Sequence, residues 1–500
     1  MGTTTVQDAA DSPEPRAATA AAPPPSAATR LRAGTIGAWD LVFFVVAAAA
    51  PLTVMSGVAP LAIQFGGVGA PGGYLVAGIV MATFAVGFTA MSRHVPNAGA
   101  FYAYIGRGLG RPLGVGASLV AVLAYNAIGI GLLAATGTFA ATTMRDVLHV
   151  DLPWWLWGLV AWAIVGVLGY RNITLSARVL GLFLLLEVAI LGVLAVPVLL
   201  DGGREGLSFA SFDPSNVFTG GVGALFVITF GAFLGFESTA IYSEEARDPR
   251  RTVRRATFAS VAFLALFYTL IVWMILMAFG PAAGLDVAAK DPTGMFFTAT
   301  HDWVGQGATD VMHVLIVTSA LAATLAFHNA SARYFHALGR EGILPRALGR
   351  ANAAGAPGPA SLTQTGLAFA VIALFTLFGA DPYMQTFLWT NGTGILGVIA
   401  LQALCSVAVI GFFRRDHRDA TLVQRLVAPG LAALALAATC VLIVKNFDLL
   451  TAAGTTANVL LIVPLPIAFA IGVVRALRIR RRDAAAYGRL TTVDVAEASA

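Results

Sequence analysis

The chain has 500 residues, of which 58% are hydrophobic and only 11% are charged. Because a soluble domain carries roughly 25% charged residues, this composition excludes a soluble enzyme, a disordered protein and a nucleic-acid-binding protein. The formal net charge is +5, and nearly all of the basic residues are arginine. Cys405 and Cys440 each lie in an apolar run, which indicates small buried side chains and neither a disulfide framework nor a zinc site.

The two ends of the chain differ from its apolar centre. Residues 1–33 are rich in Ala, Pro and Thr and lack the apolar stretch of a secretory signal, so we expect a disordered cytoplasmic tail. Residues 479–500 combine the end of an arginine cluster with a polar stretch, and we expect a second cytoplasmic tail there. The functional domain is therefore expected at residues 34–478.

Twelve apolar runs between these tails are long enough to cross a bilayer as helices. In chain order they lie at about 36–65, 73–92, 112–143, 154–170, 175–200, 217–243, 256–280, 308–338, 360–380, 384–413, 424–444 and 455–477. The sequence therefore predicts an all-α membrane protein with twelve transmembrane helices. An even number of spans puts both termini on the same side.

The positions of arginine and lysine give the direction of the spans. If the N-terminus is cytoplasmic, the outer segments hold only Arg145, Arg204, Lys290 and Lys445 of the 31 basic residues. Cytoplasmic loops of membrane proteins normally carry the excess of Lys and Arg, so the pattern favours cytoplasmic termini in the plasma (cell inner) membrane. One span more or fewer would reverse the side assigned to every later loop and remove the asymmetry of Lys and Arg. The asymmetry therefore supports the count of twelve.

No Lys or Arg lies near the middle of any span, and the acids and histidines of most interest within the spans are Asp40, Glu187, Glu237 and His328. A carboxylate at membrane depth costs several kcal/mol, so each is a functional candidate by default. A membrane enzyme would need clustered nucleophiles, bases or metal ligands, and only one histidine lies deep in a span. We therefore expect no enzymatic activity, no metal and no cofactor. The chain also lacks a Walker-type Gly-Lys sequence, which disfavours ATP-driven transport.

The first and sixth spans are interrupted at corresponding places. Pro51 removes a backbone donor within the first span, and Ser56 and Gly57 permit unwinding beyond it. The sixth span contains Gly231, Gly235 and Glu237 within a few residues, which a helix interior rarely tolerates. Such paired breaks predict an inverted-repeat transporter with its binding site near the bilayer midplane. The alternative is a proline kink in one helix and glycine-mediated packing in the other.

Broken helix ends expose N–H groups and carbonyls, which suit the carboxylate and ammonium of an amino acid. We therefore expect the substrate to contact residues near the two breaks and a polar pair in the third span: Pro51, Thr53, Val54, Ser56, Gly57, Phe233, Gly235, Phe236, Glu237, Tyr125 and Asn126. Phe233 and Phe236 could form an aromatic gate or a cation–π face. A second island, Trp389-Thr390-Asn391-Gly392, could also line the pocket. Apolar packing and interhelical hydrogen bonds remain the structural alternatives for all of these.

Three stretches resemble the amino acid–polyamine–organocation (APC) superfamily: Gly235 to Pro249, Pro96 to Pro112, and Ser331 to Pro345. The similarity covers about residues 34–475. It implies a LeuT-type fold, in which helices 1–5 and 6–10 form inverted repeats and helices 11 and 12 are peripheral.

The chain departs from the family pattern at two positions. Many members carry a glycine-rich stretch in helix one whose amides hold the substrate carboxylate, but Thr53 replaces a glycine here. Carboxylate recognition is thus less secure, and an amine remains an alternative substrate. Proton-coupled relatives often carry a lysine in helix five, where this chain has Glu187.

Glu187 is the first candidate for proton coupling, because desolvation favours the neutral form of a carboxyl group. A hydrogen-bonded structural carboxyl and a cation ligand are the alternatives. Thr324 could hydrogen-bond near Glu187, as the family's helix-eight hydroxyl does near the lysine, and it shares a helix face with His328. His328 could also titrate near neutral pH, although a lone histidine is more often packed and satisfied.

These observations together predict a secondary transporter for amino acids or related amines, with proton-coupled import by alternating access. Its partners would be a small-molecule substrate, protons and the lipid bilayer, with no nucleic acid. An exchanger of the same fold is the closest alternative, and a non-transporting nutrient sensor or a channel are more distant ones. The sequence leaves open which amino acid or amine is carried, whether protons or sodium drive it, and the oligomeric state.

Overall fold

The computed structural model describes residues 37–95, 101–171, 177–237, 247–352 and 356–490, together with the isolated residues 2 and 239. Every regular element within these ranges is a helix. The expected N-terminal tail, residues 491–500, and parts of two of the family-like stretches, residues 96–100 and 240–246, lie outside the described residues.

The first expected span consists of three consecutive helices, α1 (Ala38–Ala49), α2 (Pro51–Gly57) and α3 (Ala59–Gly66). Ala50 separates the first two and adopts a left-handed conformation with a φ of 45°, which is uncommon for a residue with a side chain. Pro51 follows as the first residue of α2, where its missing N–H costs nothing. The interruption predicted at Pro51 is therefore present, and we call Ala50–Pro51 break 1.

The sixth expected span begins with α10 (Val222–Gly231) and leaves helical geometry after Gly231. Turns occupy residues 232–237, and Gly235 has a φ of +107°, a conformation that glycine adopts readily because it has no Cβ. The predicted interruption of this span is therefore also present, and we call residues 232–237 break 6.

The other helices follow in the expected order. They are α4 (Ala70–Ser92), α5 (Phe101–Leu109), α6 (Arg111–Leu148), α7 (Trp154–Tyr170), α8 (Ala177–Asp201), α9 (Pro214–Val217), α12 (Pro249–Phe279), α13 (Pro281–Lys290), α14 (Met295–Trp303), α15 (Gln306–Arg340), α16 (Gly358–Leu377), α17 (Leu388–Arg415), α18 (Ala428–Lys445), α19 (Phe447–Thr451), α20 (Thr455–Ile462), α21 (Pro464–Arg482) and α22 (Ala484–Arg489). Two π-helical turns, η6 (Pro382–Phe387) and η7 (Val423–Val427), precede α17 and α18. Short 3-10 turns, η2 (Gly67–Gly69), η3 (Ala210–Phe212) and η5 (Arg346–Gly349), complete the set.

Ten helical stretches in the described part of the chain are long and apolar enough to cross a membrane. The shorter helices α7 and α10 are also apolar and coincide with the fourth and sixth expected spans. The chain is thus a multi-pass integral membrane protein, while the exact count of twelve spans and the inverted repeat stay predictions.

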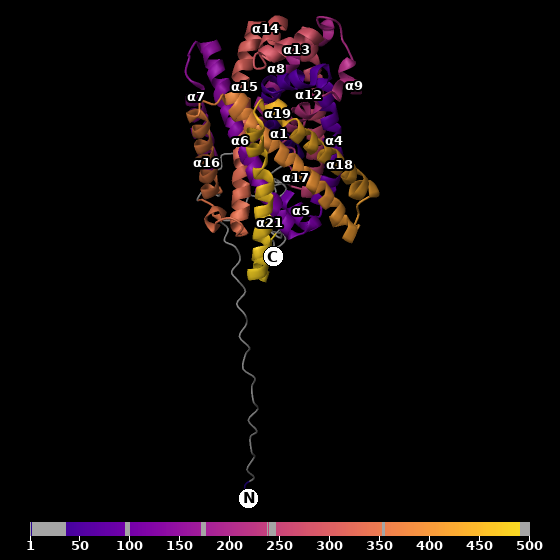
Figure 1. The fold of residues 1–500 in the computed structure, drawn as a ribbon, viewed down its shortest axis with the longest axis vertical. Helices are drawn as coiled ribbons and strands as arrows, with labels where there is room; N and C mark the ends of the chain where they lie inside the picture. Colours follow the sequence, from indigo (N-terminus) through magenta and orange to yellow (C-terminus); the bar gives the residue numbers. More distant parts are fainter. Residues whose placement is uncertain are drawn as a thin grey trace.

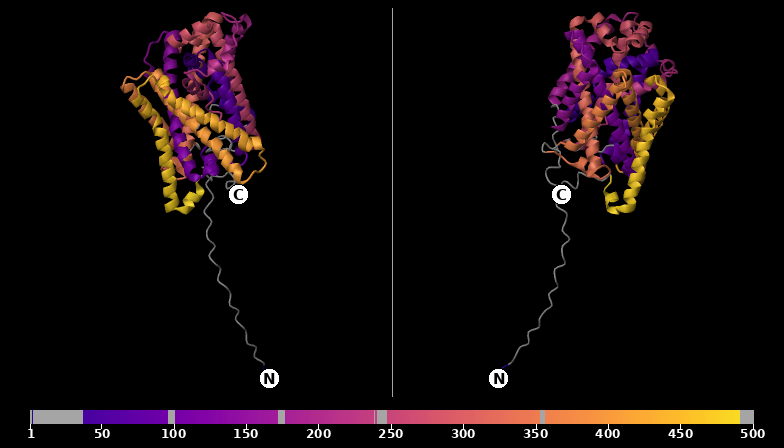
Figure 2. Two further views of the ribbon diagram at one scale, coloured as in Figure 1. Left: turned by 45° about the vertical axis from the view of Figure 1, so that its right-hand side comes forward. Right: turned by 60° about the vertical axis from the view of Figure 1, so that its left-hand side comes forward.

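The long helices run side by side and leave smaller helices at the two ends of the bundle (Figures 1 and 2). Helices α13, α14 and α9 cover one end, and α5 lies at the opposite end near the C-terminal end of α21 (Figure 1). The long helix α6 passes through the centre and packs against α15, α17 and α21. Side chains of α6 also reach both broken spans, since Tyr125 donates to Glu237 and the Phe139 ring lies against Gly57.

The C-terminal segment folds back onto the end of the bundle near α5. After α21 ends at Arg482, the short helix α22 brings Leu490 into a small apolar cluster with Tyr102 and Leu338. Arg111 donates hydrogen bonds to the carbonyl oxygens of Gly488 at 2.9 Å and Leu490 at 3.0 Å. The expected C-terminal tail therefore includes an ordered segment up to Leu490.

Candidate functional site

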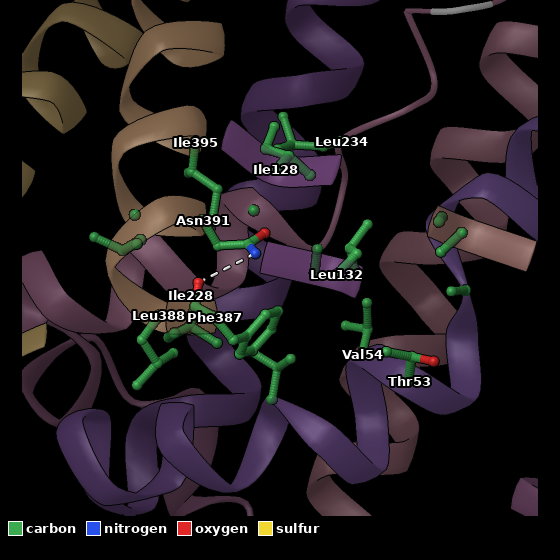
Figure 3. Close-up of a pocket in the computed structure, with 18 of the residues that line it drawn as sticks. Thr53, Val54, Ile128, Leu132, Ile228, Leu234, Phe387, Leu388, Asn391 and Ile395 are labelled. Atoms are coloured by element: carbon green, nitrogen blue, oxygen red, sulfur yellow. Dashed lines mark hydrogen bonds between the residues drawn. The ribbon is translucent and has the colours of Figure 1, made fainter. Parts of the chain in front are cut away.

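A cavity of about 70 Å³ lies between the two broken spans (Figure 3). Its wall comes from α1, α2, α6, α10, break 6, α15, η6, α17 and α19. The lining residues are Ala48, Ala49, Ala50, Thr53, Val54, Val58, Ile128, Leu132, Val227, Ile228, Gly231, Ala232, Leu234, Ala323, Phe327, Phe387, Leu388, Asn391, Gly392, Ile395 and Leu450.

The two breaks face each other beside this cavity. A Cβ placed on Gly235 would lie 3.5 Å from the Cβ of Ala48 and 3.8 Å from the backbone nitrogen of Ala49. The Tyr268 hydroxyl donates to the carbonyl oxygen of Ala49 at 3.3 Å, so one carbonyl freed by break 1 has a partner. Two chain segments far apart in sequence thus put irregular backbone at one place, which membrane proteins tolerate where the backbone is buried or borders a cavity.

Among the described lining residues, two side chains carry polar atoms, and they are Thr53 and Asn391. Thr53 is 1% exposed, and its hydroxyl has no hydrogen-bond partner among the described residues. Asn391 donates from Nδ2 to the carbonyl oxygen of Phe387 at 3.3 Å (Figure 3). Because buried polar atoms are normally paired, the Thr53 hydroxyl is available to a ligand in the cavity.

Glu187 lies on α8 and is buried beside break 1. Its Oε2 atom accepts hydrogen bonds from the Ser319 hydroxyl of α15 at 2.8 Å and from the Leu52 amide of α2 at 3.2 Å. The Thr53 amide points to the same Ser319 hydroxyl at 3.4 Å. The carboxylate therefore ties the first turn of α2 to two long helices.

Glu237 is fully buried within break 6. Its Oε1 accepts from the Tyr125 hydroxyl of α6 at 2.6 Å, and its Oε2 accepts from the Gly235 amide at 3.0 Å. Glu237 does not belong to the cavity wall. In this arrangement the carboxylate satisfies an amide that the break frees, and it fastens the break to α6.

The two aromatic residues expected at break 6 pack away from the cavity wall. Phe236 meets Phe84 of α4 edge-on at 5.9 Å between ring centroids, and Phe84 stacks on Phe88. Phe233 meets Tyr268 edge-on at 6.2 Å. Phe236 therefore holds break 6 against α4, and Phe233 holds it against α12.

The remaining residues expected near break 1 and in the third span have separate surroundings. Pro51 begins α2, and the buried Ser56 hydroxyl has no partner among the described residues. The Gly57 carbonyl oxygen accepts a hydrogen bond from the Tyr383 hydroxyl. Asn126 donates to the Val122 carbonyl oxygen at 2.6 Å within α6. Of the expected substrate contacts, only Thr53 and Val54 belong to the cavity wall.

The other two candidates for proton coupling lie apart from Glu187. The Thr324 hydroxyl pairs with Thr136 of α6 at 3.0 Å, so the hydroxyl that contacts Glu187 comes from Ser319 instead. His328 shares a hydrogen bond of 3.0 Å with the Ser361 hydroxyl of α16. The structure therefore does not bring Thr324 or His328 together with Glu187.

Most of the cavity wall was not expected from the sequence. Ile128 and Leu132 of α6, and Ala323 and Phe327 of α15, face the cavity, yet a lipid-facing position of the same helix would also be apolar. Asn391 and Gly392 did stand out, because they form part of the polar–aromatic island in the tenth expected span. Within the described ranges, no group of three or more His, Cys, Asp or Glu side chains could hold a metal ion.

The sequence has relatives of known function. A family model described as "Amino acid permease" matches residues 40–485. The chain is 26% identical to the branched-chain amino acid permease BcaP of Lactococcus lactis, over 63% of this chain and 70% of the relative. It is also 26% identical to the L-lysine transport protein of Corynebacterium glutamicum, over 63% of this chain and 64% of the relative.

A third relative carries a different kind of substrate. The low-affinity putrescine importer PlaP of Escherichia coli is 24% identical, over 55% of this chain and 61% of the relative. All three relatives are named as transport proteins. Since the family model spans most of the chain, including both breaks and the helices around the cavity, the protein belongs to the amino acid permease family of the APC superfamily.

Proposed function

We propose that this protein is a secondary active transporter that imports amino acids or related amines together with protons by alternating access. The transporter domain comprises residues 34–478, crosses the plasma membrane twelve times as a LeuT-type inverted repeat, and has both tails in the cytoplasm. The observation that carries the proposal is the buried cavity between two opposed helix breaks. Relatives that carry branched-chain amino acids, lysine and putrescine support transport, but they differ in substrate class.

Two aromatic contacts lie next to the broken spans and are our candidates for gates. At η6, the Tyr383 hydroxyl donates to the Gly57 carbonyl oxygen, and its ring lies near Phe139. Toward α5, Phe236, Phe84 and Phe88 form a packed cluster that continues to Tyr104. In the proposed alternating-access cycle these two contacts open in turn.

Glu187 supplies a physical link between a proton and this movement. As a carboxylate it accepts charge-assisted hydrogen bonds from the Leu52 amide and the Ser319 hydroxyl, and such bonds are stronger than neutral ones. A proton on Glu187 removes the charge and weakens its hold on α2. The first span is then freer to move relative to α8 and α15, so protonation favours a change of access.

The experiment is uptake into proteoliposomes that contain the purified full-length chain. A panel of radiolabelled amino acids and polyamines is offered with and without an imposed pH gradient, acidic outside. Proton-coupled import predicts concentrative uptake that requires the gradient. Uptake that never exceeds equilibration without counter-substrate would indicate an exchanger, and non-saturating flux would indicate a channel. Binding without any flux would indicate a sensor.

A further inference from the structure

We propose that the cavity between break 1 and break 6 selects amino acids with a compact, uncharged, apolar side chain, and rejects cationic amino acids and polyamines. The inference rests on the proposed function, because it names the substrate class of the same site. It is needed because the transporter relatives do not agree on a class. The cavity wall itself supplies the evidence.

The wall offers hydrocarbon on nearly every side. Leu132 of α6, Ile228 of α10 and Ile395 of α17 face the cavity from three different helices (Figure 3). Among the described residues that line the cavity, none is an Asp, Glu, Lys, Arg or His. Contact with such a wall removes an aliphatic side chain from water, which is favourable.

A second ammonium group would find no counterion in this wall. The nearby carboxylates, Glu187 and Glu237, do not line the cavity. Each already accepts one hydroxyl and one backbone amide from the protein. Transfer of a lysine, arginine or diamine cation to an apolar surface without a partner carries a large desolvation cost.

The cavity is also small. Its volume of about 70 Å³ corresponds to a handful of water-sized groups, at roughly 10–15 Å³ each. A compact side chain therefore fits with less rearrangement of the wall than the longer chains of lysine and arginine need. Against putrescine, which is itself small, the wall selects by charge.

Thr53 and Asn391 give this apolar cavity a polar part for the groups that all amino acids share. They come from α2 and α17 and lie at separate places around the cavity (Figure 3). The Thr53 hydroxyl, which lacks a partner among the described residues, can donate to the substrate carboxylate.

The test measures how unlabelled compounds compete with radiolabelled L-leucine for uptake into proteoliposomes of the full-length protein. We expect alanine, valine, isoleucine and leucine to compete about tenfold better than lysine, arginine or putrescine, since a buried unpaired charge is penalised. Lysine or putrescine carried as well as leucine would overturn the inference and leave the proposed transport function intact. If the folded, reconstituted protein carries no amino acid or amine at all, the proposed function fails and this inference fails with it.

Asn391→Asp tests whether this cavity is where selection occurs. The change adds a carboxylate to the wall at nearly constant volume, so lysine should compete about tenfold better and leucine less well. Asn446→Asp is the matched control, because Asn446 also donates from Nδ2 to the carbonyl four residues earlier, at 2.9 Å from Leu442, but lies outside the wall. Unchanged lysine competition in folded Asn391→Asp would contradict the inference.

Thr53→Val serves if Asn391→Asp does not fold, since it removes only the unpartnered hydroxyl. It should raise the KM for leucine about tenfold, as expected for a lost hydrogen bond to a charged group, while aliphatic amino acids stay preferred over lysine. An unchanged KM would contradict the role of Thr53, and a switch of preference toward lysine would overturn the assignment of the apolar wall.

Discussion

Glu187 and Glu237 are buried carboxylates with the same kinds of partner, yet they connect different parts of the molecule. Each accepts one hydroxyl and one backbone amide. The amide on Glu237 belongs to Gly235, two residues away within break 6. The amide on Glu187 belongs to Leu52, 135 residues away in α2. Burial and hydrogen bonding alone therefore do not distinguish the two, and the proposal that Glu187 couples protons rests on the elements that it joins.

Replacement of Glu187 should have the largest effect on proton-driven transport and so test the difference between the two glutamates most strongly. In Glu187→Gln the group no longer gains or loses a charge, so gradient-driven accumulation of substrate should fall to the equilibrated level. Exchange of internal for external substrate should persist, because the cavity wall is untouched. The measurement is uptake with and without a pH gradient, beside a counterflow assay. Full accumulation by the variant would leave Glu187 as a structural carboxyl.

Replacement of Glu237 should affect stability more than coupling. Glu237→Gln retains the shape but loses the charge that receives the Tyr125 hydroxyl and the Gly235 amide, which should cost about 1–3 kcal/mol. Thermal unfolding in detergent measures this loss, and Tyr125→Phe should show a smaller one. The accumulation ratio per unit of pH gradient should stay as in the wild type. If Glu237→Gln lost its response to the pH gradient but kept its stability, Glu237 would share the coupling role proposed for Glu187.

Ser319→Ala should reduce gradient-driven uptake less than Glu187→Gln does, and it tests one hydrogen bond of Glu187. It removes the 2.8 Å hydrogen bond to the carboxylate and leaves the Leu52 amide in place, so the rate of gradient-driven uptake should fall about tenfold. Thr324→Ala is the matched control, because its hydroxyl pairs with Thr136 and not with Glu187. Equal losses in the two variants would show that the contact with Glu187 is not the cause.

Replacement of a carboxylate at the surface should have the smallest effect on the pH dependence of uptake. Asp419 is 66% exposed and lies 3.0 Å from the His94 ring nitrogen. A hydrogen bond with its own backbone, followed by the nearby His94 and Arg93, holds the pKa of Asp419 below its usual value. The contribution of Asp419 to the stability of the folded protein is therefore complete above the unfolded pKa of about 3.9. It is lost only as the pH falls through the lower pKa of the folded state.

The pH profile of uptake by Asp419→Asn should consequently keep the wild-type shape from about pH 5 to 8, because Asp419 itself does not change its charge in that range. The check is the complete pH profile of uptake in both proteins. A shifted profile would mean that a surface carboxylate, and not Glu187, contributes to the pH dependence.

The sequence predicted the parts of the fold that depend on chemically unusual residues. Pro51 and Gly235 identified the two breaks, because each disturbs helical geometry in its own way. Glu187 and Glu237 were prominent because a carboxylate within an apolar span is costly. Proline, glycine and charged residues can be recognised in the sequence alone. In the structure the proline and the glycine lie at the breaks, and the two glutamates are buried at or beside them.

Most of the cavity wall could not be predicted from the sequence, because its residues are chemically ordinary for a membrane span. Leu132, Ile228 and Ile395 are apolar residues in apolar spans, and their neighbours that face lipid have the same character. Likewise, Thr324 was an equal candidate to Ser319 for the contact with Glu187, since both are small hydroxyl residues of one helix. Only the packing of α15 against α8 determines which of them reaches the carboxylate.

Direct detection of proton movement tests the central claim, that Glu187 couples protons to transport, without relying on an imposed gradient. Proteoliposomes with a pH-sensitive dye trapped inside receive a neutral amino acid from outside, with membrane potential clamped. The wild type should acidify the interior as substrate enters, and Glu187→Gln should exchange substrate without acidification. Acidification of equal size in Glu187→Gln would contradict the account.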